Sequence, residues 1–321
     1  MIHPTAIVDA RARLGEGVVI GAFSVIGPHV TLDAGVEIGH HVVLEGWLEV
    51  GARASIGHGS VVGGVPQDLK FTPDTRSGVR IGGGTVVREH VTIHRATTPD
   101  GWTEIGRDCL LMSGSHVAHD CRLGDEVIVI NYAGITGHCE VGDRATIGGL
   151  SGLHPFTRVG EHAYVGGCAK VVADVPPYLL VDGSPATARG VNVIGLRRAG
   201  MPPDDRRALQ DAYRILYRSG LAPRTAAERI REELGDRAAV RRLAEFVLGA
   251  RRGICGPPRE SSSNNRPTGR SIVARTESAA QPVADGTESA ADGTESAADG
   301  AESGADGAES GADGAQPERM A

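Results

Sequence analysis

The stretch "VIGAFSVIGPHVTLDAGVEIGHHVVL" (residues 19–44) decides the fold, because an aliphatic residue returns at every sixth position. The residue four positions after each aliphatic is small or apolar, and glycine often follows the aliphatic directly. An α-helix turns every 3.6 residues and cannot keep a six-residue period on one face. A short strand followed by a tight turn can keep it. The repeating aliphatics here are Ile20, Ile26, Leu32, Ile38 and Leu44.

The same period continues from residue 2 to residue 171, apart from two interruptions. Three six-residue steps make one coil of about 18 residues, which is the hexapeptide β-helix. The aliphatic residues point inward, small residues fill the corners and glycine relieves the turns. We therefore predict a mainly β fold, with a β-helix over residues 1–190 and loop insertions at about 63–80 and 95–104.

Composition and charge agree with a fold packed from small and β-branched side chains. Apolar residues make up 40% of the chain but aromatic residues only 3%, and 46 of the 321 residues are glycine. Such a composition is unusual for a core of large side chains and typical of a repetitive fold. The formal charge of −7 gives no reason to expect nucleic acid as a partner.

The cysteines and the N-terminal residues indicate the cellular compartment in which the protein works. Five cysteines, an odd number without a C-x-x-C pair, argue against a disulfide framework or a zinc ribbon. Cys109, Cys121 and Cys139 fall on the small interior position, so we expect them in the core. The opening "MIHPTAIVDA" does not read as a signal peptide, and no apolar run approaches the ~20 residues of a membrane helix. We expect a cytoplasmic protein without membrane insertion.

After Val171 the six-residue period fades, and from about Asp204 the pattern becomes helical. Apolar residues at helical spacing in 204–220 and again in 225–253 predict a small α-helical C-terminal domain over residues 191–254. Residues 255–321 repeat acidic and small residues every seven positions without large apolar side chains. We interpret this segment as a disordered acidic tail, inert or used for tethering.

Histidines gather in one part of the coil, beginning with "SGSHVAHDCRLG" (residues 113–124). His119 lies two residues after the inward Val117, so its side chain should point outward. His138 follows almost one coil later and should stack near His119, and His154 lies one coil further. His116 flanks the same inward residue, and His94 from the interrupted region is a candidate neighbour.

Three interpretations of these histidines are open. They are solvent-exposed residues, a zinc site shared between subunits, or a catalytic base with its helper. Neutral imidazoles suit zinc, but the spacing in "HVAHD" differs from that of zinc hydratases with this fold, so we expect no metal. In the third interpretation His119 removes a proton from a hydroxyl and Asp120 fixes its tautomer. Adjacent strand residues point to opposite faces, so Asp120 would have to reach round at a turn.

Short motifs along residues 1–250 resemble the UDP-N-acetylglucosamine acyltransferases that begin lipid A synthesis. The resemblance implies left-handed coils and a homotrimer with active sites between subunits. It also implies transfer of a fatty acyl group, usually 3-hydroxyacyl, from acyl carrier protein to the glucosamine 3-hydroxyl. No cofactor is implied beyond the phosphopantetheine of the carrier. The motifs are "QDLKF" (67–71), "VTIHRAT" (91–97), "HVAHDC" (116–121), "GITGHCEVGD" (134–143), "VGGCAKVVADVPPYLLVDG" (165–183) and "GVNVIGLRR" (190–198).

The resemblance also implies roles for particular residues. His119 is the general base supported by Asp120, the backbone N–H of Gly137 stabilises the oxyanion, and His138 orients substrate. The resemblance makes Asn192 and Arg198 hold nucleotide or carrier phosphate, and it makes Gly167 limit acyl length. The residues that contact sugar and phosphate are Asp68, Lys70, His116 and His154. For Lys70 the alternative is a solvent-exposed loop charge.

Three positions depart from the family pattern. Pro155, Ile194 and Ala199 stand where the family commonly has Gln, an acidic residue and a second Arg. Contacts to the nucleotide are therefore fewer, which leaves a different sugar or metabolite acceptor open. A trimeric zinc-dependent hydratase and a catalytically silent scaffold are further alternatives. The sister N-acyltransferase is less suitable because it carries a domain before its coils, whereas here the period starts at residue 2.

Overall fold

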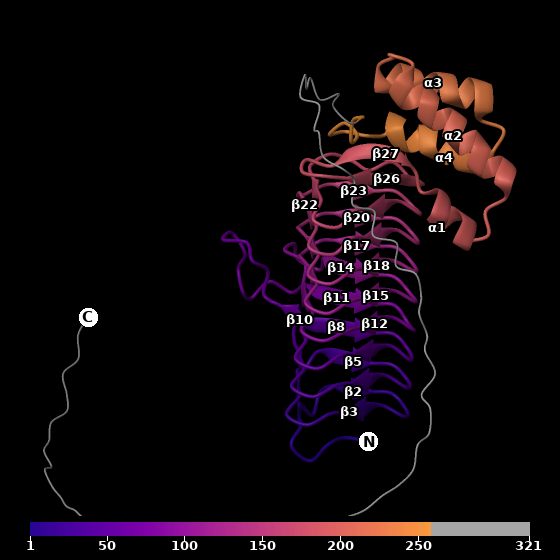
Figure 1. Ribbon diagram of the computed structural model, residues 1–321. Coiled ribbons are helices and arrows are strands. Elements are labelled where there is room, and N and C mark those ends of the chain that lie inside the picture. The colour runs from indigo at the N-terminus through magenta and orange to yellow at the C-terminus, as the bar shows by residue number, and fades with distance from the viewer. Residues whose placement is uncertain (258–321) are drawn as a thin grey trace, which may run out of the picture. The chain divides into compact units, whose positions relative to one another are not determined.

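The computed structural model describes residues 1–257 and shows three parallel sheets wound into a column (Figure 1). Successive strands belong to the three sheets in turn, so the chain visits each sheet once per coil. The fold is a left-handed parallel β-helix, as predicted. Each sheet is built from short strands whose bounds follow.

The first sheet contains β1 (Ile7–Val8), β4 (Val25–Ile26), β7 (Val43–Leu44), β10 (Val61–Gly64), β13 (Thr92–His94), β16 (His116–Val117), β19 (Gly134–Ile135), β22 (Gly152–Leu153) and β25 (Lys170–Val171). The second contains β2 (Arg13–Leu14), β5 (Val30–Leu32), β8 (Trp47–Val50), β11 (Gly78–Ile81), β14 (Trp102–Ile105), β17 (Arg122–Leu123), β20 (Glu140–Val141) and β23 (Arg158–Val159). The third contains β3 (Val19–Ile20), β6 (Glu37–Ile38), β9 (Ser55–Ile56), β12 (Val86–Val87), β15 (Leu110–Leu111), β18 (Ile128–Val129), β21 (Thr146–Ile147), β24 (Tyr164–Val165), β26 (Leu179–Asp182) and β27 (Thr187–Val191).

Strand pairing confirms the coil length expected from the six-residue period. Val25 pairs with Val43, which is one 18-residue coil later. Pairing continues across both interruptions, because β10 pairs with β13 and β13 pairs with β16. The chain between β10 and β11 and the chain between β13 and β14 therefore form loops on an unbroken column. The last pair, β26 with β27, is antiparallel.

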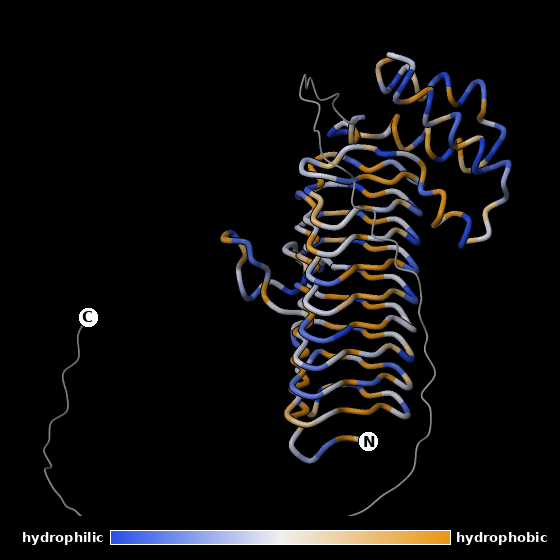
Figure 2. The backbone as a smooth tube through the Cα atoms, in the orientation of Figure 1, coloured by the Kyte–Doolittle hydropathy of each residue, from blue (hydrophilic) through white to orange (hydrophobic). Residues whose placement is uncertain are grey.

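The core consists of the aliphatic and small residues that repeat in the sequence. Figure 2 shows hydrophobic positions recurring at the same place on successive coils. The interior cysteines Cys109, Cys121 and Cys139 are buried, as expected. The first coil is less protected: Ile2 is 47% exposed, because no coil lies beneath it.

Four helices follow the β-helix: α1 (Val193–Arg198), α2 (Pro203–Arg218), α3 (Pro223–Leu234) and α4 (Ala238–Leu248). The predicted apolar face of α2 is buried, and the hydroxyl of Tyr213 donates to the carbonyl of Ala188 in β27 at 3.0 Å. Arg242 of α4 bonds both Glu161 and the hydroxyl of Tyr178 on the column. No helix in this described part of the chain combines the length and apolar character needed to cross a bilayer. Most of the predicted tail, from residue 258 on, lies outside the described residues.

Candidate active site

The candidate site lies at the corner where the chain passes from the first sheet to the second. His119 and Asp120 follow β16, and Gly137 and His138 follow β19 one coil later. The backbone N–H of His138 donates to the carbonyl of His119 at 3.1 Å, which joins the two turns. The 18-residue coil therefore places Gly137 against His119 and His138 against Asp120.

A left-handed backbone turns the Asp120 side chain toward its neighbour. Asp120 has a φ of 58°, a conformation that bends the chain sharply at this corner. Its Oδ2 consequently lies 2.8 Å from Nδ1 of His119. The two side chains are 13% and 15% exposed, respectively, so the contact is largely shielded from water. The turn thus allows a contact that alternating strand residues could not make.

The Asp120 carboxylate accepts further hydrogen bonds from the loop between β13 and β14. The Thr97 hydroxyl donates to Oδ2 at 2.6 Å, and the Thr97 N–H lies 3.2 Å from both oxygens. Burial alone would raise the pKa of Asp120, but the bonds from Thr97 and His119 outweigh it and lower that pKa. A charged carboxylate can only accept a hydrogen bond, so Nδ1 of His119 is the donor of this contact and Nε2 is the ring nitrogen that does not bond Asp120.

His138 completes the corner. Its Nε2 lies 3.7 Å from Oδ2 of Asp120, and its ring meets that of His119 edge-on with centroids 5.2 Å apart. The ring of Phe156, one coil later, stacks on the ring of His138 with centroids 4.5 Å apart. The expectation that His154 continues this stack is wrong, because one full coil after His138 ends at Phe156. Nδ1 of His154 instead lies 3.3 Å from Nη2 of Arg252.

Two more histidines lie beside the corner on the first sheet. Nδ1 of His116 lies 2.7 Å from the hydroxyl oxygen of Thr92, and the His94 ring meets His116 edge-on with centroids 4.8 Å apart. Burial lowers the pKa of His116. Burial, together with the neighbouring His116 and His119, lowers the pKa of His94 to about 4. Both rings are therefore neutral near pH 7. Nδ1 of His94 is buried without a hydrogen-bond partner within residues 1–257.

Gly137 is packed against the ring of His119. A Cβ at this position would lie 2.5 Å from Cε1 and 2.7 Å from Nε2 of that ring. The close approach requires glycine. Within residues 1–257 the N–H of Gly137 forms no backbone hydrogen bond, so this donor beside the free Nε2 is available.

Asp68 and Lys70 lie on the loop between β10 and β11, which projects from the column (Figure 1). Oδ1 of Asp68 accepts the backbone N–H of Lys70 at 2.9 Å. No contact in the described part of the chain joins either side chain to the histidines. Their substrate role stays a prediction.

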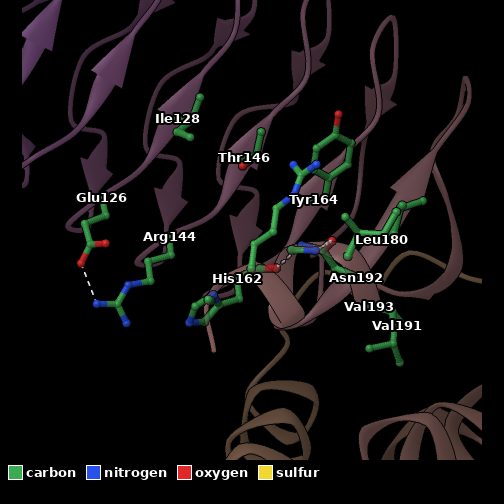
Figure 3. A pocket seen from close by; sticks show the side chains of 14 residues that line it. Glu126, Ile128, Arg144, Thr146, His162, Tyr164, Leu180, Val191, Asn192 and Val193 are labelled. Atoms are coloured by element: carbon green, nitrogen blue, oxygen red, sulfur yellow. Dashed lines mark hydrogen bonds and ion pairs between the residues drawn. The ribbon is translucent and has the colours of Figure 1, made fainter. Parts of the chain in front are cut away.

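Asn192 and Arg198 line a cavity of about 830 Å³ between the third sheet and α1 (Figure 3). Asn192 caps α1: its Oδ1 accepts the N–H of Gly195 at 3.1 Å, and its Nδ2 donates to the carbonyl of His162 at 3.0 Å. Ile194 and Ala199, two of the departures from the family pattern, line the same cavity. The floor of this cavity is formed by outward side chains of the third sheet: Ile128, Thr146, Tyr164 and Leu180.

The structure thus brings some of the predicted residues together and separates others. His116, His119, Asp120, Gly137 and His138 form one cluster. Three other sets of predicted residues lie elsewhere. Asp68 and Lys70 lie on the loop between β10 and β11, Asn192 and Arg198 lie at the two ends of α1, and Gly167 lies at the corner between the third and first sheets. Sequence reasoning gave Thr97 no role, although it ends the motif "VTIHRAT".

The cluster offers two kinds of chemistry. The ligand atoms of His119, Asp120 and His138 lie within 4.8 Å of one another, close enough for a metal ion. Oδ2 of Asp120, however, already accepts hydrogen bonds from Thr97 and His119. An imidazole nitrogen without a partner among residues 1–257, a largely shielded carboxylate behind it and an unused backbone N–H together suit general-base catalysis with an oxyanion donor.

Two family models and several known proteins are similar to this chain in sequence. The family model described as "Udp N-acetylglucosamine O-acyltransferase; Domain 2" matches residues 174–255, and the model "Bacterial transferase hexapeptide (six repeats)" matches residues 11–46. Two relatives carry the name acyl-[acyl-carrier-protein]–UDP-N-acetylglucosamine O-acyltransferase. The one from Aquifex aeolicus is 52% identical over 254 residues, covering 79% of this chain and 97% of the relative. The one from Syntrophobacter fumaroxidans is 45% identical over 255 residues, covering 79% and 98%.

Solved structures agree with these relatives. The UDP-N-acetylglucosamine acyltransferase of Francisella novicida is 33% identical, with a TM-score of 0.78 over 81% of this chain and 95% of that one. The UDP-N-acetylglucosamine acyltransferase of Bacteroides fragilis is 34% identical, with a TM-score of 0.77 over 79% and 99%. The similarity therefore covers about four fifths of this chain and is not limited to the repeat.

Proposed function

The chain belongs to the acyl-[acyl-carrier-protein]–UDP-N-acetylglucosamine O-acyltransferases, and we propose that His119 is the general base of their reaction in this protein. The protein transfers an acyl group from acyl carrier protein to UDP-N-acetylglucosamine, the first step of lipid A biosynthesis. The observation that carries the proposal is the contact between Nδ1 of His119 and Oδ2 of Asp120, which leaves Nε2 of His119 free.

In the proposed mechanism Nε2 of His119 takes the proton of the sugar 3-hydroxyl as its oxygen attacks the thioester carbonyl carbon. Asp120 stabilises the imidazolium that forms, since its carboxylate is charged and largely shielded from water. The N–H of Gly137 donates to the oxygen of the tetrahedral intermediate. When the C–S bond breaks, the imidazolium returns the proton to the carrier thiolate, and no other co-reactant is needed.

The neighbouring histidines have a different proposed task. His116, on the same coil as His119, and His138, on the next coil, present polar ring nitrogens that suit the hydroxyl and amide groups of a sugar. Since burial lowers the pKa of His116, its ring stays neutral and can both donate and accept hydrogen bonds. His154, displaced from the stack, would contact substrate from the next coil.

We further propose a homotrimer in which the site lies between subunits. Asn192 caps α1 and Arg198 is its last residue, whereas His119 lies at the corner between the first and second sheets. A second copy could bring its cavity, and its loop with Asp68 and Lys70, to the histidine corner. Arg198 and Lys70 would then supply the cations that a diphosphate requires. We expect a cytoplasmic enzyme without a resident metal or cofactor.

Two alternatives follow from specific observations. Ile194 and Ala199 line the cavity where charged side chains would contact a nucleotide, which favours testing other acceptors. The cluster of His119, Asp120 and His138 favours testing for zinc. A zinc hydratase should retain stoichiometric metal after purification, and the acyltransferase should keep full turnover after treatment with a chelator.

The decisive experiment incubates the protein with UDP-N-acetylglucosamine and a panel of acyl carrier protein thioesters, with the products identified by mass. His119→Ala should lower turnover at least ~100-fold, which is the usual contribution of a general base. His41→Ala, an exposed histidine that only stacks on Phe23, is the matched control and should keep turnover. Unchanged turnover in His119→Ala would exclude His119 from the mechanism.

A further inference from the structure

The loop between β13 and β14 reaches the candidate base through one side chain. Thr97 donates three hydrogen bonds to the Asp120 carboxylate, one from its hydroxyl at 2.6 Å and two from its N–H at 3.2 Å. Oδ2 of Asp120, which accepts the shortest of these bonds, is also the atom that meets His119. The hydroxyl of Thr97 and the ring of His119 therefore bind the same oxygen.

The loop is anchored on both sides of Thr97. The N–H of Arg95 donates to the carbonyl of Gly64 at 3.1 Å, and Ala96 is fully buried. After Thr97 the chain turns, with the N–H of Gly101 donating to the carbonyl of Thr98 at 2.9 Å. The chain on either side of Thr97 is thus held by contacts that do not involve Asp120.

The backbone of Asp120 is fixed independently. Its N–H donates to the hydroxyl oxygen of Thr103 at 2.9 Å, and Thr103 is fully buried in β14. With the backbone held by Thr103, rotation of the side chain is the remaining freedom. The Thr97 hydroxyl removes that freedom, because a hydroxyl donating to a charged carboxylate forms a short and strong bond.

We propose that Thr97 is a positioning residue of this enzyme, which holds the Asp120 carboxylate so that Oδ2 stays on Nδ1 of His119. The inference rests on the proposed role of His119 and deepens it. It gives the insertion between β13 and β14 a purpose: it carries a hydroxyl to the carboxylate that orients the base. Thr97 acts through Asp120 and does not touch the reacting atoms.

The test compares Thr97→Val with Thr97→Ser by measuring kcat and KM for both substrates. Valine keeps the β-branched shape and the N–H bonds but lacks the hydroxyl, whereas serine keeps the hydroxyl. We expect Thr97→Val to lower kcat about ten-fold with KM unchanged, since a hydrogen bond to a charged group is worth roughly that factor. Thr97→Ser should keep most of the activity. Thr98→Val, in the same loop but exposed and without a contact to Asp120, is the control and should match the wild type.

A double-mutant comparison separates positioning from a purely structural role. If Thr97 acts through Asp120, Thr97→Val should cause no further loss of kcat in the Asp120→Asn background. A full and independent loss in that background, or a wild-type kcat in Thr97→Val alone, overturns the proposal. If Thr97→Val cannot be purified, Thr97→Ala, which adds no atom to the site, replaces it.

Failure of this inference can be told apart from failure of the proposed function. His119→Ala and Asp120→Asn are measured in the same assay. If His119→Ala keeps its turnover, the assignment of the base is wrong and the role of Thr97 is lost with it. If His119→Ala is inactive while Thr97→Val matches the wild type, only the positioning role is wrong.

Discussion

Gly137 lies one coil from His119 and so close to it that a Cβ on the glycine would lie 2.5 Å from Cε1 of the histidine ring. The contact joins the proposed oxyanion donor to the proposed base. No side chain, however small, fits between the two turns unless the ring moves. The position of the His119 ring therefore depends on the absence of a side chain on the neighbouring coil.

Gly137→Ala should consequently displace the His119 ring and lower kcat. A misplacement of about 1 Å at a catalytic group commonly costs on the order of 10²-fold, and we expect a loss of that size. Gly134→Ala is the matched control, because a Cβ at Gly134 would meet nothing within 4 Å. Circular dichroism should first show that the two variants are folded to the same extent. Equal turnover in Gly137→Ala and Gly134→Ala would then contradict the packing argument.

The sequence alone predicted the column and the pairing of His119 with His138, because the 18-residue coil is encoded by the period itself. It did not predict Phe156 above His138, since counting from one histidine to the next gave His154 and ignored the coil length. Thr97 was missed for another reason. It lies in an insertion where the period stops, so only the folded loop shows that it meets Asp120.

Buried His94 should make stability depend on pH. The folded state lowers its pKa from 6.5 to about 4, so between these values only the unfolded chain takes up the proton. The contribution of neutral His94 to the free energy of unfolding is therefore fully present above pH 6.5 and decreases as the pH falls toward about 4. At pH 5 the decrease is about 2 kcal/mol. Between pH 7.5 and about pH 5, the free energy of unfolding of His94→Gln should therefore decrease by about 2 kcal/mol less than that of the wild type. The measurement is urea unfolding at one protein concentration.

The control for this pH effect is His41→Gln, since His41 is exposed at a corner of the column. Its replacement should leave the pH dependence of the wild type unchanged. A His94→Gln variant that destabilises in parallel with the wild type on acidification would show that other groups, and not His94, take up the proton.

Tyr178 connects the column to the helices. Its side chain is fully buried, and its hydroxyl donates to Glu161 while accepting from Nε of Arg242 in α4. Tyr178→Phe removes the hydroxyl but lets Glu161 and Arg242 keep their ion pair, so the expected loss is about 1 kcal/mol. Tyr132→Phe, at an exposed tyrosine, is the control and should change the unfolding midpoint little. Indistinguishable midpoints for the two variants would contradict this role.

Gly167 tests the proposed limit on acyl length. It lies exposed at the corner between β24 and β25, and a Cβ there would meet only the carbonyl oxygen of Gly149, at 3.4 Å. The open space suits a long acyl chain, and a large side chain would fill it. Gly167→Met should therefore shift the preference toward shorter thioesters while leaving turnover with the short ones intact, because His119 and Asp120 lie at a different corner.

The measurement is competition among carrier thioesters of graded length. A wild-type preference for chains much shorter than about a dozen carbons would contradict this role, and so would an unchanged preference in Gly167→Met. Each buried methylene contributes about 0.8 kcal/mol, and that contribution would then arise at a surface other than Gly167.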